Sequence, residues 1–523
     1  MTSGPMVEID SGRIEGRAAD GVDSFKGIPY AAPPVGRLRF RPPAPVEPWT
    51  GSRPASAYGA EAPQDSGRVD TLKGPSGLAQ SEDCLTLNVF APGDGTGERG
   101  GGLPVMVFIH GGGFSTGTSG HIAHDGTVLA RRGELVVVTI NYRLGALGLL
   151  AHPCLRDDAS GQIGNWALLD QIAALRWVNR NIGQFGGDPG NVTIFGLSAG
   201  GGSVGALAIC PGARALFRRA IIQSSSPLPA DRATHLEAAE TLLDKLGIEP
   251  SLAALQAADC DAIQAAQPNW VAKLQGTRTA PRPFVDGDLL PDWPDAILAT
   301  GLTDGLDLMV SHTRDEISSL AMFLPPEAIP RTDADLERFL GRLGLDGGAL
   351  IAGYRAARRA RGEAHDPWAL WVALQSDRLI RVPSMHFLAG HAARGNGAWA
   401  CTITRESDWR PAVPGDRDLG ACHVIDLPLI FGVHDATPEL RRLVGGTPGA
   451  DELATVMQDA WIAFAQTGSP ATEALAAWRP YDPETRATMM LGDELTLVED
   501  PWGPERELME RAVPPPAALR SVA

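Results

Sequence analysis

Five short apolar runs, rich in β-branched residues, constrain the fold of this 523-residue chain more than any other feature. They are "LPVMVFIH" (103–110), "LVVVTIN" (135–141), "NVTIF" (191–195), "AIIQ" (220–223) and "LDLMVS" (306–311). Apolar and polar residues do not alternate in these runs, and this is typical of strands that are covered on both faces. A later run, "AWACTIT" (398–404), is a further expected strand. Such strands usually belong to a parallel sheet that lies between layers of helices.

The clearest helical pattern lies between the second and third runs, in "NWALLDQIAALRWVNRNIG". Leu168, Ile172 and Leu175 recur there at three- and four-residue steps, which predicts a helix with one apolar face. Gly183 is expected to end this helix. Strands alternating with helices predict an α/β fold, with a mostly parallel central sheet flanked by helices.

Two regions depart from this pattern. The first 100 or so residues are rich in proline and glycine and fit a small N-terminal antiparallel region. From about 320 to 395, charged and helix-forming sequence predicts a helical subdomain over the sheet. We expect one domain spanning residues 1–523, with residues 320–395 as a subdomain within it.

Composition excludes several classes of function. Forty-five basic and 62 acidic side chains give a net charge of −17, which disfavours nucleic acid as a partner. No apolar run approaches the roughly 20 residues of a membrane span, and no secretory signal is evident, so we expect a cytoplasmic protein without membrane partners. The six cysteines show no metal-ligand spacing, which predicts neither zinc nor a disulfide framework.

A candidate nucleophile stands in the pentapeptide G-x-S-x-G, which occurs three times, centred on Ser115, Ser198 and Ser203. With 61 glycines in the chain, the pentapeptide alone is weak evidence. Only Ser198 lies between an expected strand, "NVTIF", and an expected helix, "AGGGSVGALA", as the sharp turn of a nucleophilic serine requires. We therefore predict that Ser198 is the nucleophile and that Ser115 and Ser203 are structural. An ordinary serine in a glycine-rich turn is the alternative.

A second motif points to the same chemistry. The segment "HGGGF" (110–114) follows the first apolar run directly, and its glycines let backbone N–H groups approach a substrate oxygen. Acyl transfer needs such donors to stabilise the oxyanion, together with the N–H of the residue after the serine. This predicts an oxyanion hole formed by Gly112, Gly113 and Ala199. A merely flexible loop is the alternative reading of the glycines.

Long stretches of the chain resemble the type-B carboxylesterase and cholinesterase family, near its bacterial para-nitrobenzyl esterase branch. The matching segments include "FKGIPYAAPPVGRLRF" (25–40), "SEDCLTLNVFAP" (81–92), "VFIHGGGFSTG" (107–117), "FGGDPGNVTIFGLSAGG" (185–201) and "LGACHVIDLPLIFG" (419–432). The resemblance implies the α/β-hydrolase fold, hydrolysis of carboxylic esters through a serine triad, and no metal or organic cofactor.

The resemblance also implies the acid of the triad. Hydrolases of this fold order their triad as serine, acid and histidine along the chain. "VSHTRDE" is similar to the family's acid segment and implies Glu316 as the acid, with Asp315 as the neighbouring alternative. Ile317 stands where the family usually has glycine, and His312 where it usually has asparagine.

Five histidines follow this acid: His365, His386, His391, His423 and His434. Spacing alone does not choose among them. "GACHVIDLPLIFG" is similar to the family's histidine loop and implies His423 as the base, although Asp426 stands where glutamate is more usual. Ser224, in "QSSSP", resembles a family serine that hydrogen-bonds the acid.

The sequence departs from the family at two places, one that concerns a disulfide and one that concerns substrate choice. Ala62 replaces the cysteine that secreted relatives pair with the equivalent of Cys84, so the resemblance implies that this disulfide is missing. The loop 62–81 contains no aromatic residue to hold a choline ammonium group, which disfavours cholinesterase activity. We predict a serine carboxylesterase acting on small ester substrates. An amidase, carbamate or lactone hydrolase with the same triad, and a non-catalytic binding protein, are the alternatives, and monomer or homo-oligomer is left open.

Overall fold

A single large sheet organises the molecule. The computed structural model describes residues 4–65, 70–93, 101–227, 229–267, 282–407, 409–410, 418–446 and 449–513. Within them, eleven strands are ordered β14-β13-β12-β11-β10-β9-β7-β8-β6-β4-β3. Their bounds are β3 Arg17–Ala19, β4 Val22–Pro29, β6 Thr86–Pro92, β7 Leu103–Ile109, β8 Val136–Ile140, β9 Gly187–Leu197, β10 Arg219–Gln223, β11 Asp307–Thr313, β12 Ala398–Ile403, β13 Ala487–Leu491 and β14 Leu495–Glu499.

The central strands of this sheet are parallel. Every neighbouring pair from β8 through β7, β9, β10, β11 and β12 to β13 is parallel, whereas the pairs at the two edges are antiparallel. The predicted mostly parallel central sheet is therefore confirmed, and all six expected strands lie within it. A separate small sheet holds the N-terminal strands β1 (Met6–Ile9) and β2 (Gly12–Glu15), which are antiparallel, and β5 (Ser52–Pro54).

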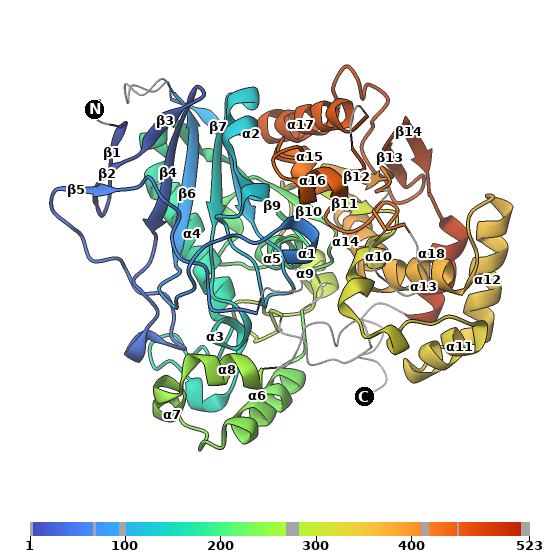
Figure 1. Cartoon of the computed structure of the whole chain (residues 1–523), viewed down its shortest axis with the longest axis horizontal. Coiled ribbons are helices and arrows are strands. Elements are labelled where there is room, and N and C mark those ends of the chain that lie inside the picture. The colour runs from blue at the N-terminus through green and yellow to red at the C-terminus, as the bar shows by residue number, and fades with distance from the viewer. Residues whose placement is uncertain are drawn as a thin grey trace.

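Helices cover both faces of the sheet (Figure 1). Their bounds are α1 Asp70–Lys73, α2 Thr127–Gly133, α3 Gly145–Leu149, α4 Trp166–Asn181, α5 Ala199–Ala208, α6 Arg232–Leu246, α7 Leu252–Ala257, α8 Cys260–Ala266, α9 Pro294–Thr300, α10 Glu316–Leu320, α11 Asp333–Arg342, α12 Gly347–Ala360, α13 Pro367–Ser376, α14 Val382–Ala392, α15 Asp426–Ile430, α16 Pro438–Leu443, α17 Gly449–Thr467 and α18 Gly503–Ala512.

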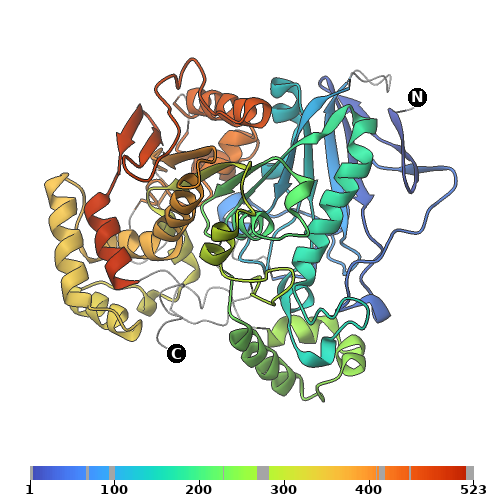
Figure 2. The same ribbon diagram turned by 180° about the vertical axis from the view of Figure 1, so that it is seen from behind.

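The two faces carry two apolar cores. On β7, Phe108 packs into one core together with residues of α2, α13 and α17, whereas its neighbour Val107 packs into the other with residues of α4 and α14. Figure 2 shows α4 from behind, lying across its face of the sheet. Successive side chains of a strand point to opposite faces, so a strand covered on both sides must be apolar at every position. This is the physical reason for the continuous apolar runs.

Helices α11 to α14 occupy most of the region 320–395. Leu336, Phe339 and Trp371 from this region belong to the same core as Met309 of β11. Helix α14 packs against β11 and β12, whereas α11 packs against α12 and α13. The division into one domain with a helical subdomain stays a prediction.

Helix α4 ends at the predicted position. Its last residue is Asn181 and its C-cap is Ile182, so the α-helix ends directly before Gly183. The chain continues in a 3₁₀ turn, Ile182–Phe185, and Gly186, with a φ of 86°, closes that turn. Gly183 itself does not adopt the left-handed conformation that often ends helices, and Gly186 supplies it instead.

Candidate active site

Ser198 lies in a strained turn between β9 and α5. Strand β9 ends at Leu197 and α5 begins at Ala199, so one residue reverses the chain, with φ 58° and ψ −123°. A non-glycine residue in this region costs about 1–3 kcal/mol and persists only where its surroundings hold it. The backbone supplies that hold, because the Ser198 N–H donates to the Gln223 carbonyl at 2.9 Å. The serine is half-buried at the carboxyl end of β9.

Glycines make this turn possible. A Cβ built on Gly200 would lie 2.0 Å from the Ile109 carbonyl oxygen, and one on Gly196 would lie 2.6 Å from the backbone of Gly200. Both distances are far below an ordinary contact of carbon with oxygen. Helix α5 can therefore approach the ends of β7 and β9 only because these two positions have no side chain.

The glycine loop after β7 presents unpaired backbone donors. Gly112 and Gly113 have φ angles of 118° and 62°. Within the described residues, neither N–H donates a hydrogen bond, while the Gly112 carbonyl accepts from the N–H groups of Ser115 and Thr116 at 3.1 and 3.0 Å. Ala199 is the first residue of α5, where a helix leaves its N–H groups without an internal acceptor. These three amides are free to bind a substrate oxygen.

Glu316 and His423 form a buried pair across 107 residues of sequence. The His423 Nδ1–H donates to Glu316 Oε2 at 2.5 Å, and the other carboxylate oxygen accepts from the Thr313 N–H at 2.7 Å. Burial of the carboxyl opposes its ionisation, but the charge and hydrogen bond of His423 outweigh it and lower the pKa of Glu316. The carboxylate is therefore ionised and fixes the orientation of the imidazole ring.

Asp315, the alternative acid, has a different set of contacts. Its carboxylate pairs with Arg314 at 2.8 Å and accepts from the Ala421 N–H at 3.0 Å. Asp315 thus anchors the loop that carries His423 and does not contact the imidazole. Of the two acidic residues, the geometry favours Glu316 as the partner of His423.

Ser198 and His423 line one cavity of about 70 Å³ together with Gly111, Gly112 and Gly113. The His423 Nε2 atom is buried and has no hydrogen-bond partner among the described residues, Ser198 included. Much of the remaining wall is apolar and includes Leu72, Leu320, Phe323, Leu427, Leu440 and Leu443. The cavity places a serine hydroxyl, an imidazole and backbone donors around a space suited to an apolar group.

The other residues singled out in the sequence lie outside this constellation. Ser203 is inside α5, where its hydroxyl accepts from Gln171 at 3.0 Å, and the Ser115 hydroxyl lies 3.5 Å from the Gly113 carbonyl. The other four histidines that follow Glu316 in the sequence form hydrogen bonds with groups that do not line the cavity. His365 bonds the Glu363 carbonyl, His386 bonds Asp295, His391 bonds Thr303 and Leu306, and His434 bonds Asp451.

Ser224 is buried beside Glu316 and helps to lower the pKa of that carboxyl.

Sequence reasoning missed two features of this site. The cavity wall includes Lys73 and His124, which come from α1 and from the turn Ile122–His124. Asp426 was noted only as a departure from the family, yet it is buried and interacts electrostatically with both Glu316 and His423. No local sequence pattern predicts these residues, because folding brings them to the site from separate segments of the chain.

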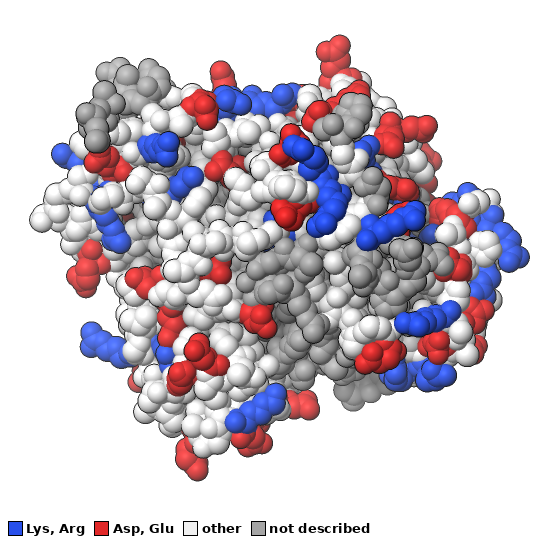
Figure 3. All heavy atoms as spheres, viewed as in Figure 1, with Lys and Arg blue, Asp and Glu red and all other residues white. Residues whose placement is uncertain are grey.

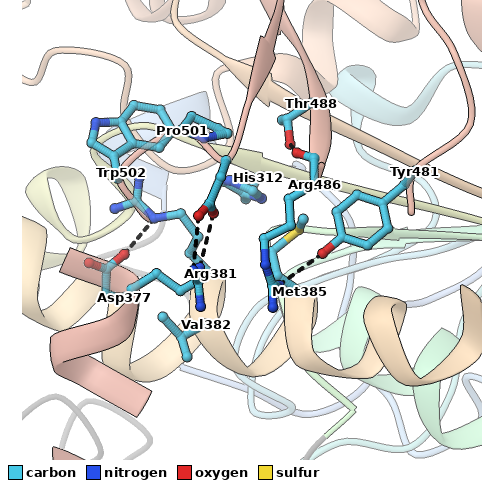
Figure 4. Close-up of a pocket in the computed structure, with 12 residues that line it drawn as sticks. His312, Asp377, Arg381, Val382, Met385, Tyr481, Arg486, Thr488, Pro501 and Trp502 are labelled. Carbon is cyan, nitrogen blue, oxygen red and sulfur yellow. Dashed lines mark hydrogen bonds and ion pairs between the residues drawn. The ribbon is translucent and has the colours of Figure 1, made fainter. Parts of the chain in front are cut away.

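A second cavity, of about 30 Å³, lies between the π-helical turn Asp377–Arg381 and the segment before α18 (Figure 4). Arg381 donates to Asp377 at 2.5 Å, and its guanidinium lies 4.4 Å from the centre of the Trp502 ring. Arg506 pairs with Asp500 at 2.9 Å. Arg381 and Arg506 are thus paired with carboxylates, and the described lining residues include no serine or cysteine. The two hydroxyl groups that line the cavity, those of Tyr481 and Thr488, are hydrogen-bonded to Arg486.

The described residues contain no group of three or more His, Cys, Asp or Glu side chains placed to hold a metal ion. None of the described helices is both long and apolar enough to span a bilayer. All six cysteines are unpaired thiols. On the face shown in Figure 3, acidic and basic side chains are interspersed, so the net charge of −17 is not gathered into one patch there.

Comparison with known proteins identifies the family. Residues 3–506 match the model of the carboxylesterase family. The chain belongs to this family. A para-nitrobenzyl esterase from Bacillus subtilis is 36% identical over 508 residues, covering 96% of this carboxylesterase and 98% of the relative. A fumonisin B1 esterase from Sphingopyxis macrogoltabida is 34% identical, covering 90% of this chain and 84% of its own.

Solved structures agree. A Geobacillus stearothermophilus carboxylesterase, 33% identical, superimposes with a TM-score of 0.82 over 96% of this chain and 99% of its own. A para-nitrobenzyl esterase, 34% identical, gives a TM-score of 0.79 over 98% and 100%. This carboxylesterase thus has the α/β-hydrolase fold and is a carboxylic ester hydrolase, as the sequence predicted.

Proposed function

We propose that this carboxylesterase forms a covalent acyl-enzyme on Ser198, with Glu316 and His423 completing the catalytic triad and Gly112, Gly113 and Ala199 forming the oxyanion hole. The observation that carries the proposal is one cavity that holds the serine of a strained turn together with an imidazole oriented by a buried carboxylate. Among the described residues, the Nε2 atom of His423 has no hydrogen-bond partner, so it is free to accept the proton of the Ser198 hydroxyl.

In the proposed mechanism, each group has a defined role. His423 Nε2 removes the proton of the Ser198 hydroxyl as the serine oxygen attacks the ester carbonyl. The negative charge on the carbonyl oxygen is stabilised by the three backbone N–H groups. Glu316 stabilises the imidazolium, which then protonates the departing alkoxide. Water, activated by the same imidazole, hydrolyses the acyl-enzyme and releases the carboxylic acid.

The cavity supports a preference for neutral or weakly polar ester substrates. Seven leucine and phenylalanine residues line the cavity, and burying an apolar acyl or alcohol group against them is favourable by about 25 cal/mol per Å². The same triad can act on amides, carbamates or lactones, so these remain the second candidate class. All six cysteines are unpaired thiols, and Ala62 stands where secreted relatives have the cysteine that pairs with the equivalent of Cys84. Both observations support a location in the reducing cytoplasm.

The direct test uses Ser198→Ala with p-nitrophenyl esters and the matching p-nitroanilides as substrates. We expect kcat/KM for the esters to fall about 10³-fold or more, because the variant cannot form the acyl-enzyme. A fluorophosphonate probe should label the wild type at Ser198 and leave the variant unlabelled. Wild-type turnover by the folded variant would refute the assignment, and faster hydrolysis of the anilides would favour the amidase reading. A wild-type protein inert to both substrates and probe would indicate a binding protein.

A further inference from the structure

A row of polar side chains crosses the sheet beneath the loop that carries His423. Gln223, Ser311 and Cys401 are register partners on the neighbouring strands β10, β11 and β12, so their side chains point to the same face. All three are buried. The Gln223 Oε1 atom has no hydrogen-bond partner among the described residues. Polar atoms are rarely left in this state in a core, and this one lies beside the candidate triad.

Asp426 contacts this row of side chains through Gln223. It is the first residue of α15, three positions after His423, and its exposed fraction is 0%. Its Oδ2 atom accepts from the Gln223 Nε2–H at 2.9 Å. Its Oδ1 atom is buried and has no partner among the described residues. The hydrogen bond joins the histidine loop to β10, the strand whose last carbonyl also accepts from the Ser198 N–H.

The charge of Asp426 is coupled to the triad. Burial raises the pKa of Asp426, the hydrogen bond from Gln223 lowers it, the nearby Glu316 carboxylate raises it and His423 lowers it, with a net value of about 6. The carboxyl therefore changes its charge close to neutral pH, where esterases of this type exchange protons through an imidazole. A charge that changes within a fully buried site acts strongly on its neighbours, because water does not screen it.

The other groups around Asp426 do not compete for this role. Burial raises the pKa of the Cys401 thiol to about 12, so the thiol is neutral. His124, in the turn packed against α15, has a pKa well below its usual range, mainly because of burial, and is neutral as well. From α17, Gln458 faces α15 and is bonded to the Leu429 carbonyl. Among the described ionisable groups, Glu316 and His423 shift the pKa of Asp426.

We propose that Asp426 is a positioning residue for His423: it holds the histidine loop against β10 through Gln223 and, when ionised, its negative charge stabilises the imidazolium form of His423. This inference rests on the proposed function. It assigns the imidazole two carboxyl groups, Glu316 in direct contact and Asp426 behind it. Loss of the second negative charge makes His423 a weaker base without changing its hydrogen bond to Glu316.

The test compares pH profiles of kcat/KM from pH 5 to 9, with p-nitrophenyl acetate read at the isosbestic wavelength of the product. Asp426→Asn keeps the shape of the side chain and removes its charge. We expect the midpoint of its acid limb to move to lower pH by about half a unit to one unit, because the imidazolium has lost a stabilising charge. We also expect kcat/KM on the alkaline plateau to fall about three- to tenfold, and this deficit to shrink toward acid pH.

Further variants separate this effect from a structural defect. Asp377→Asn removes another buried carboxylate, paired with Arg381 away from the triad, and should leave the acid-limb midpoint unchanged. Asp426→Glu restores a carboxyl and should keep the wild-type midpoint. Gln223→Met removes the hydrogen bond that favours ionisation of Asp426, so its midpoint should move in the same direction as that of Asp426→Asn. The Gln223 variant carries the test if Asp426→Asn does not fold.

The outcomes are distinct. An unchanged midpoint in both Asp426→Asn and Gln223→Met, or an activity loss by one factor at every pH, would overturn the inference. If Ser198→Ala abolishes turnover and probe labelling while those profiles match the wild type, only the role of Asp426 fails. If Ser198→Ala remains active, the proposed function itself fails.

Discussion

Gly200→Ala would test whether backbone contact at the serine turn sets the geometry of catalysis. The added methyl group would lie 2.0 Å from the Ile109 carbonyl oxygen and 2.8 Å from that of His110. Neither neighbour can move as a flexible side chain does, because both are main-chain atoms at the end of β7. Helix α5 and β7 must therefore separate.

The size of that movement follows from the contact distance. Cβ atoms essentially never approach another heavy atom closer than 3.0 Å, so the gap at Ile109 must widen by about 1 Å. Overpacking of this kind costs about 1–3 kcal/mol of stability. A 1 Å misplacement of a catalytic group can lower the rate about 100-fold. We expect Gly200→Ala to fold with reduced stability and to lose about 100-fold in kcat/KM, since the oxyanion amides and Ser198 no longer align.

The assay is hydrolysis of p-nitrophenyl acetate, together with the rate of fluorophosphonate labelling and the thermal unfolding midpoint. Gly212→Ala is the matched control, because a Cβ there meets nothing within 4 Å and its φ lies outside the left-handed region. That variant should match the wild type in all three measurements. If Gly200→Ala retains wild-type kcat/KM and labelling rate, close packing at this turn does not determine the position of the serine, and the argument is wrong.

Two further predictions concern stability. Arg143 and Asp170 form a buried pair at 2.6 Å, so Asp170→Asn should cost about 3–5 kcal/mol in urea unfolding by leaving a buried charge, whereas Asp459→Asn, in the exposed pair with Arg132, should cost about 0–1 kcal/mol. Equal losses in the two variants would contradict this reasoning. Val424 has a φ of 71°, so the free energy of unfolding of Val424→Gly should exceed that of Val424→Ala by about 1 kcal/mol, the reverse of the usual order, and its thermal unfolding midpoint should be higher. A less stable glycine variant would show that the backbone there is unstrained.

The sequence predicted the centre of the sheet better than its edges. Strands β7 to β12 are buried on both faces, so their apolar runs are recognisable without any other information. Strand β4, "VDSFKGIP", mixes polar, charged and apolar residues, and β14 is exposed at four of its five positions. Strands of this kind are stabilised by pairing with a neighbour far away in sequence, and a local pattern does not report that pairing.

The candidate site divides in the same way. Ser198 and the glycine loop could be predicted from their own segments, because a tight turn and an approachable backbone require particular residues next to one another. Glu316 and His423 were inferred only through the family resemblance, since 107 residues separate them and many other carboxylates and several histidines fit the chain order. The proposed role of Asp426 could not be predicted in this way, because it depends on the register of three strands and on burial, and no single segment of the sequence determines these.

The architecture explains why residues so distant in sequence meet. Ser198 follows β9, Ser224 follows β10 and Glu316 follows β11, and these adjacent parallel strands end at one edge of the sheet. Among the described residues, no strand ends directly before His423. Its loop is held to the acid's segment, because the Asp315 N–H donates to the Ala421 carbonyl at 2.9 Å while the Asp315 carboxylate accepts from the Ala421 N–H.

The imidazole is therefore positioned from two sides. Asp315 fixes the start of its loop to the end of β11, and Asp426 fixes the following helix to β10 through Gln223. Both strand ends also hold other residues of the site. Glu316, which bonds His423, follows β11, and the Gln223 carbonyl at the end of β10 accepts from the Ser198 N–H. Because both strands are hydrogen-bonded to the segment that carries His423, a shift of either strand would move the imidazole together with the groups at that strand end.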